Sequence, residues 1–157
     1  MKKLVSIIAF LFLLAAASAQ TPAFRKEINA FLKSDSVSMP AKGQILFVGS
    51  SSFTFWKDVQ NYFPTHPIIN RGFGGSSLRD LIRYADEIII PYQPKQIVIY
   101  CGENDLADSV GTKPRQVLRR YKTLISVIRK KLKHIPVVFI SIKPSPSRWK
   151  LEPLFVQ

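Results

Sequence analysis

The stretch QILFVGSSS, residues 44–52, decides the fold, because an unbroken apolar run ends directly in a polar turn. An apolar run without polar alternation is typical of a strand buried on both faces, as the strands of parallel sheets are. Two more runs, residues 67–70 and 96–100, lead in the same way into the turns NRGFGG (residues 70–75) and GEND (residues 102–105). The carboxyl ends of parallel strands meet at one edge of an open sheet, so we expect the three turns to lie together.

The rest of the sequence alternates helix and strand signals, which predicts a parallel sheet with helices on both of its faces. A fourth strand is expected over residues 137–142, and Ser77 and Asp80 have the spacing of a capping box at a helix start. Helices are expected over residues 24–35, 53–63, 77–89, 112–135 and from 151 onward. Within residues 53–63 the apolar side chains expected to face inward are Phe55, Trp56, Val59 and Phe63. We therefore predict an α/β fold, a three-layer α/β/α sandwich with a flavodoxin-like sheet that is incomplete at its C-terminal end.

The N-terminus has the three parts of a secretory signal peptide. Lys2 and Lys3 give a positive start, residues 4–17 are apolar, and Ala17-Ser18-Ala19 is a small-x-small cleavage pattern. The apolar run is shorter than the roughly 20 residues that usually span a bilayer. We expect cleavage before Gln20, export to the periplasm or the medium, no membrane span after cleavage, and a single domain over residues 20–157.

The charge balance is strongly basic, with 23 Lys and Arg against 10 Asp and Glu, and a formal net charge of +13. Much of the excess falls on residues 115–133, where apolar residues recur at helical spacing, so a solvated helix face is expected rather than a nucleic-acid site. An anionic surface such as lipid or acidic polysaccharide remains an open partner. Cys101 is the only cysteine, which excludes an internal disulfide, and we expect a small buried thiol there.

Each of the three turns carries one residue that serves acyl-transfer chemistry. Ser51 follows a strand and opens a helix, where free backbone amides favour developing negative charge. The glycine-rich turn at residues 70–75 lets the backbone approach a ligand closely, and Asn104 offers a side-chain amide donor. Taken singly, these residues are also explained as a helix cap, a flexible turn and an Asx turn.

Together the turns resemble the sequence blocks of the SGNH (GDSL-type) hydrolases. The stretch at residues 49–51 matches Gly-Asp-Ser, with Ser50 in place of the aspartate, and the other two turns match Asn-x-Gly-x-x-Gly and Gly-x-Asn-Asp. The resemblance implies a serine ester hydrolase that works through an acyl-enzyme, on a small-molecule, carbohydrate or lipid ester. It implies Ser51 as the nucleophile and first oxyanion amide, Gly75 as the second amide and Asn104 as the side-chain donor. Neither a cofactor nor a metal is implied.

The family's Asp-x-x-His block, which supplies the general base, does not occur in the 157 residues. His66 and His134 each precede a predicted strand, so both are expected at the edge opposite Ser51. We therefore expect this chain to be truncated and inactive alone, with the base beyond residue 157. A non-catalytic ligand-binding module on the same fold is the alternative. A flavodoxin-like cofactor domain is less favoured, because the first turn is short for a phosphate cradle.

Overall fold

The computed structural model describes residues 21–107, 111–143 and 145–155. The predicted signal peptide lies outside these residues. Among the described helices, none combines the length and the apolar character needed to cross a membrane.

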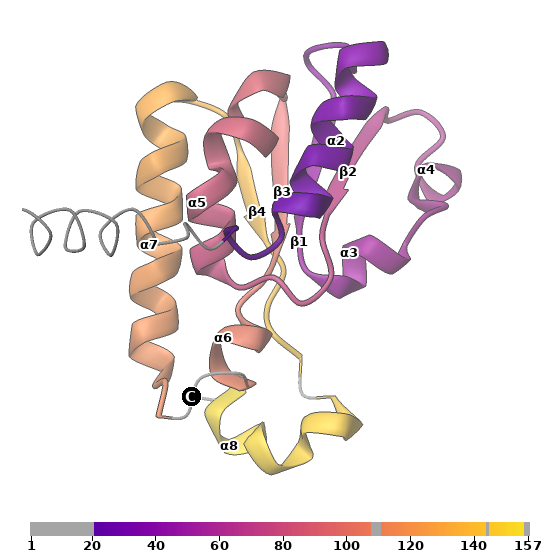
Figure 1. Cartoon of the computed structure of the whole chain (residues 1–157). Coiled ribbons are helices and arrows are strands. Elements are labelled where there is room, and N and C mark those ends of the chain that lie inside the picture. The colour runs from indigo at the N-terminus through magenta and orange to yellow at the C-terminus, as the bar shows by residue number, and fades with distance from the viewer. Residues whose placement is uncertain (1–20, 108–110, 144, 156–157) are drawn as a thin grey trace, which may run out of the picture.

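The centre of the fold is a four-stranded parallel sheet (Figure 1), as predicted. Its strands lie in the spatial order β2-β1-β3-β4. They are β1 (Ile45–Gly49), β2 (Ile68–Gly72), β3 (Gln96–Tyr100) and β4 (Val137–Phe139). Gly49, the last residue of β1, pairs with Gly72 and Tyr100, so β1, β2 and β3 end level with one another. The three polar turns therefore start from one edge.

Helices cover both faces of the sheet, but unequally. The thicker layer contains α2 (Arg25–Val37), α5 (Leu78–Ile88) and α7 (Pro114–Lys131), which pack on Leu46, Val48, Ile97 and Ile99. The thinner layer contains α3 (Ser51–Phe55) and α4 (Val59–Tyr62), which pack on Ile45 and Phe47. Alternate residues of β1 face opposite layers, which is why the whole strand is buried. The remaining elements are η1 (Ile90–Tyr92), α6 (Glu103–Ala107), η2 (Pro146–Leu151) and α8 (Glu152–Phe155).

The predicted helix over residues 53–63 is wrong, because the segment forms two short helices separated at Trp56. The side-chain amide of Asn70 donates to the carbonyl oxygens of Phe53, at 2.7 Å, and Trp56, at 3.2 Å. In a continuous helix these carbonyls would accept from backbone N–H groups four residues on. As a further correction, two of the side chains expected to face inward are exposed, Phe55 at 77% and Phe63 at 40%.

Several element ends also differ from the prediction. Strand β4 stops at Phe139 rather than residue 142, although the N–H of Ile140 still donates to the carbonyl of Ile99 at 2.9 Å. Strand β2 continues to Gly72, where it pairs with the end of β1. The capping interaction at α5 is confirmed: the Asp80 carboxylate accepts from the Ser77 N–H at 2.9 Å and from the Ser77 hydroxyl at 2.6 Å.

A buried polar cluster joins α2, β2 and η1 behind the sheet edge. The Tyr92 hydroxyl accepts from Arg71 Nε and donates to Asp35 Oδ2, both at 2.5 Å, and Arg71 also pairs with Asp35. The Arg71 guanidinium lies over the rings of Phe31 and Tyr92. Burial, and next the hydrogen bond to Asp35, raises the pKa of Tyr92 to about 12. The cluster fixes α2 and η1 against the second strand.

Candidate active site

Ser51 is the first residue of α3, two residues after the end of β1, and its side chain is half-buried. Two backbone hydrogen bonds hold this strand end to both neighbouring turns. The Ser50 N–H donates to the carbonyl of Tyr100 at 3.1 Å, and the Phe73 N–H donates to the carbonyl of Gly49 at 2.9 Å. The turn that carries Ser51 is therefore fixed between the other two.

The glycine turn lies against Ser51. A Cβ placed on Gly74 would lie 4.0 Å from the Cβ of Ser51, and one on Gly75 would lie 3.7 Å from the ring of Phe24. Gly75 has a φ of +82°, which glycine adopts without the strain that a side chain causes. Within the described residues, the backbone N–H groups of Ser51 and Gly75 donate to no other group. Both are therefore available to an oxygen placed between them.

Asn104 joins all three turns from its place in α6. Its Nδ2 donates to the Ser50 hydroxyl at 2.8 Å and to the carbonyl of Ser76 at 2.9 Å, while its Oδ1 accepts from Arg148 Nη2 at 2.8 Å. The side chain is only 6% exposed. Both hydrogens of the Asn104 amide are thus engaged. An oxyanion would receive one of them only by displacing the hydroxyl of Ser50. Ser50 is the residue that stands where the family pattern has aspartate.

A second set of contacts, which the sequence did not predict, ties the C-terminal segment to α6. The Glu103 carboxylate accepts from Tyr100, at 3.2 Å, and from Ser145, at 3.1 Å, and Arg148 Nη1 lies 3.3 Å from it. Burial, and next the Glu103 charge, raises the pKa of the Tyr100 hydroxyl above its ordinary value. Arg148 therefore bridges Glu103 and Asn104 from 44 residues away, a separation at which the sequence carries no local signal.

The neighbouring Asp105 has a structural role. Its Oδ2 accepts from the N–H of Leu78, at 2.8 Å, and its Oδ1 from Arg120 Nη1, also at 2.8 Å. The side chain of Asp105 is fully buried, and its carboxylate is satisfied by the backbone N–H at the start of α5 and by the Arg120 guanidinium. This arrangement joins α5, α6 and α7 beneath the site.

Both histidines lie away from this edge. His66 precedes β2 and His134 precedes β4, and both are exposed. Ser51 follows the carboxyl end of β1, and a five-residue strand spans roughly 17 Å. Neither ring is thus placed to accept the Ser51 proton, as the sequence predicted.

A metal site and a reactive cysteine are two other chemical possibilities at this edge of the sheet. The described residues contain no group of three or more His, Cys, Asp or Glu side chains that could hold a metal ion. The Cys101 thiol is buried and donates to the carbonyl of Ser76 at 3.6 Å. Burial raises its pKa well above the ordinary value, so it is kept as an unreactive thiol. The prediction of a buried thiol is confirmed.

No family model matches the sequence, and no curated protein matches it significantly. Solved structures do match. A GDSL-like lipase from Bacteroides thetaiotaomicron superposes with a TM-score of 0.66 at 19% identity, over 82% of this chain and 69% of that one. A candidate acylhydrolase from Bacteroides fragilis gives 0.69 at 16% identity, over 86% and 70%. An esterase of the SGNH-hydrolase family gives 0.54 at 18% identity, over 70% and 64%. With its parallel sheet and flanking helices, the chain therefore has the α/β fold of the SGNH/GDSL-type hydrolases.

Proposed function

We propose that this chain carries the nucleophile and the oxyanion donors of an exported serine ester hydrolase. The Ser51 hydroxyl attacks the carbonyl carbon of an ester, a bond forms from Ser51 Oγ to that carbon, and the ester C–O bond then breaks. The alcohol leaves with the proton that a general base took from Ser51, and water later releases the acid in the same way. The substrate is a small-molecule, carbohydrate or lipid ester.

One observation carries the proposal: the glycine turn lies so near Ser51 that a Cβ added to Gly74 would meet the Ser51 Cβ at 4.0 Å, while Asn104 bonds the adjacent Ser50. The unengaged N–H groups of Ser51 and Gly75 are the donors for the negative oxygen of the tetrahedral intermediate. Asn104 supplies a third donor when the ester oxygen replaces the Ser50 hydroxyl. The general base and its aspartate are proposed to lie beyond residue 157, since neither His66 nor His134 is placed to serve.

Acyl transfer to Ser51 tests this proposal without the missing base. The chain is incubated with p-nitrophenyl acetate and with imidazole as a soluble base, and its intact mass is followed. Imidazole serves both acylation and deacylation, so the reaction is quenched in acid after a short exposure. Peptide mapping is then expected to locate an acetyl group on Ser51, while turnover without imidazole stays near background. Ser51→Ala should remove the adduct, whereas Ser52→Ala, a change at an exposed neighbour, should keep it. An undiminished adduct in Ser51→Ala would refute the proposal, as would enzyme-like turnover without imidazole.

A second candidate function is a non-catalytic module that holds an ester or acetylated sugar in the same place. It is favoured by the hydrogen bonds of Asn104, whose two amide hydrogens already have partners within the protein. Calorimetry, combined with the acetylation experiment, separates the two functions. Saturable binding of acetylated sugars, measured by calorimetry, without any acetylation of Ser51 supports the module and contradicts the hydrolase.

A further inference from the structure

The outer face of α7 is a stripe of cations that have no acidic partner among the described residues. Residues 111–134 contain nine Lys and Arg and no Asp or Glu. Four of these cations recur on one side of α7, within an arc of about 80° on a helix of 3.6 residues per turn. This basic stripe consists of Arg115, Arg119, Lys122 and Lys130.

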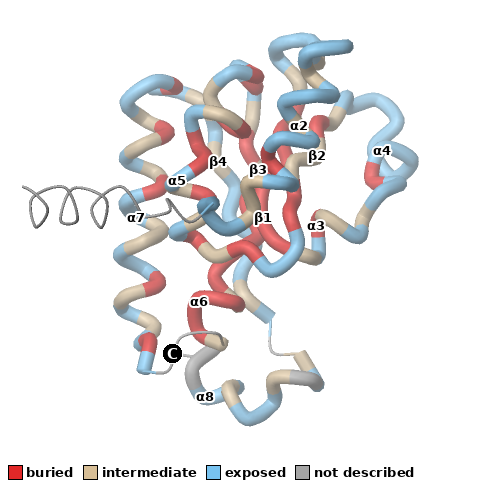
Figure 2. Tube along the Cα trace, in the orientation of Figure 1, coloured by how far each residue is buried: buried red, intermediate tan, exposed pale blue. Residues whose placement is uncertain are grey.

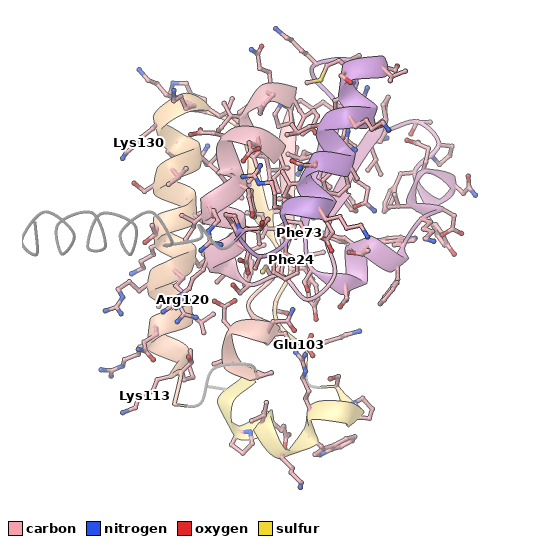
Figure 3. All side chains as sticks on the ribbon, in the orientation of Figure 1. Phe24, Phe73, Glu103, Lys113, Arg120 and Lys130 are labelled. Carbon is pink, nitrogen blue, oxygen red and sulfur yellow. The ribbon has the colours of Figure 1, made fainter. Side chains whose placement is uncertain are left out.

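The stripe faces solvent along the length of the helix. All four of its residues are exposed, whereas Val117, Leu124 and Ile128 on the opposite side of α7 are buried against the sheet (Figure 2). In Figure 3, Lys130 and the preceding Lys113 lie along the outer side of α7. From Arg115 to Lys130 the stripe is about 22 Å long, at 1.5 Å per residue.

The cations of the stripe are not used to hold the fold together. Among the described residues, ion pairs join Arg25, Arg71, Arg120 and Arg148 to carboxylates, and none involves the stripe. Arg120 and Arg129, on the same helix, show the contrast: the first pairs with Asp105, and the second donates to three carbonyls beyond the helix end. Unpaired cations repel one another, so the row favours an extended anionic partner.

An apolar hollow opens beside one flank of the stripe. It has a volume of about 560 Å³, lies between α7 and β4, and is lined by side chains that include Leu106, Leu118, Tyr121 and Phe139. Leu118 is 52% exposed, and Arg115 also lines the hollow. Cations beside exposed apolar side chains match the two layers of a bilayer surface, anionic headgroups and acyl chains. A hydrated polysaccharide would use only the cations.

We propose that α7 docks on an anionic phospholipid surface, with the basic stripe on the headgroups and Leu118 at the level of the upper acyl chains. This surface is separate from the three turns at the sheet edge, so its test does not depend on Ser51. Each cation near such a surface strengthens binding by about fivefold, so three together account for on the order of a hundredfold.

Vesicle sedimentation with matched variants tests the stripe. The vesicles hold two parts phosphatidylcholine to one part phosphatidylglycerol. Residues 1–19 are omitted from the protein, because an apolar leader binds lipid by itself. All described helices and strands follow that segment. The variant with Arg115, Arg119 and Lys122 each changed to Gln should bind on the order of a hundredfold more weakly. The control, with Lys33, Lys42 and Lys57 changed to Gln, loses the same charge from other exposed sites and should bind nearly as well as the original. Circular dichroism checks that both remain folded.

Three results would overturn the proposal. Equal losses in the two variants would mean that net charge alone drives binding, and equal binding to pure phosphatidylcholine would remove the electrostatic component. Binding to dextran sulfate without binding to vesicles would identify a soluble polyanion as the partner.

A fluorescent label tests which side of the molecule meets the bilayer. Cys101 is buried, so an environment-sensitive dye can be attached selectively at Leu118→Cys or, as the control, at Phe55→Cys on the opposite layer. On addition of anionic vesicles, emission should shift to the blue at position 118 and stay unchanged at position 55. A shift at position 55 alone would refute docking through α7.

Discussion

At the scale of single residues, Asn104 is the side chain on which most of the site depends. It donates to Ser50 and Ser76 and accepts from Arg148, so its removal takes one hydrogen bond from each of three polar groups. Asn104→Ala should lower the free energy of unfolding by about 1–3 kcal/mol. It should also slow acetylation of Ser51 by on the order of a hundredfold, the usual effect of losing one oxyanion donor.

Urea unfolding and intact-mass kinetics measure the two effects of Asn104→Ala. Asn61→Ala, at an exposed asparagine of α4, is the matched control and should change neither quantity appreciably. Equal behaviour of the two variants would contradict the central place given to Asn104.

Tyr92 makes a pH-dependent contribution to stability. Its pKa is about 12 in the folded protein and 10.0 as the ordinary value, so the folded state holds the phenolic proton more tightly than the unfolded chain does. Its contribution is therefore complete below pH 10 and is lost as the pH rises from 10 to 12. Tyr92→Phe should be less stable by about 1–3 kcal/mol below pH 10, because Asp35 and Arg71 lose a partner.

Urea unfolding at a series of alkaline pH values checks this prediction for Tyr92. The difference in the free energy of unfolding between the original protein and Tyr92→Phe should narrow above pH 10. Tyr100 and Tyr121 are present in both proteins, so their contributions to that difference cancel. A difference in the free energy of unfolding that stays constant up to pH 12 would show that ionisation of Tyr92 is not coupled to stability.

At the scale of elements, Gly49 controls how closely β1 and β3 can approach. A Cβ on this glycine would lie 2.0 Å from the carbonyl oxygen of Tyr100, a backbone atom that cannot turn aside. Gly49→Ala should therefore cost at least about 3 kcal/mol, because the strand end must move. Gly43→Ala is the control: nothing lies within 4 Å and only its φ of +77° is unfavourable, so a cost of about 1 kcal/mol is expected.

Thermal melts of the two alanine variants compare these costs directly. Similar melting temperatures for Gly49→Ala and Gly43→Ala would show that the strand end adjusts freely.

The sequence predicts those elements whose stabilising contacts leave a local pattern. Strand β1 was predictable because burial on both faces demands apolar residues at every position, and the start of α5 because Ser77 and Asp80 are three residues apart. The break at Trp56 was not predictable, since the side chain that causes it, Asn70, comes from the next strand. Within the site, the three turns were predictable from strand ends, but the bridge from Arg148 to Asn104 forms only in three dimensions.

At the scale of the whole molecule, the sheet is left partly uncovered beside β4. Val138, Phe139 and Ile140 are each about two-fifths exposed, at 41%, 40% and 40%, and β4 is an edge strand with one free side. Exposed apolar edges favour association between copies. We expect the chain to elute from size-exclusion chromatography at positions that depend on concentration.

Two lysine variants locate the association surface. Val138→Lys should shift elution toward the monomer, because a buried charge in the contact is costly. Val37→Lys, at the end of α2 where the side chain is 84% exposed, should leave the profile unchanged. A single monomer peak at all concentrations would contradict the prediction.

The residues just before α2 have a practical consequence for handling the protein. The Phe24 ring packs edge-on against Phe73, 5.4 Å between centroids (Figure 3), and the Tyr84 hydroxyl bonds the carbonyl of Ala23 at 2.5 Å. Phe24 also abuts Gly75. A fusion tag or a resin linker joined immediately ahead of Thr21 would pull on the loop that faces Ser51, so immobilisation through that end is expected to disturb the proposed site.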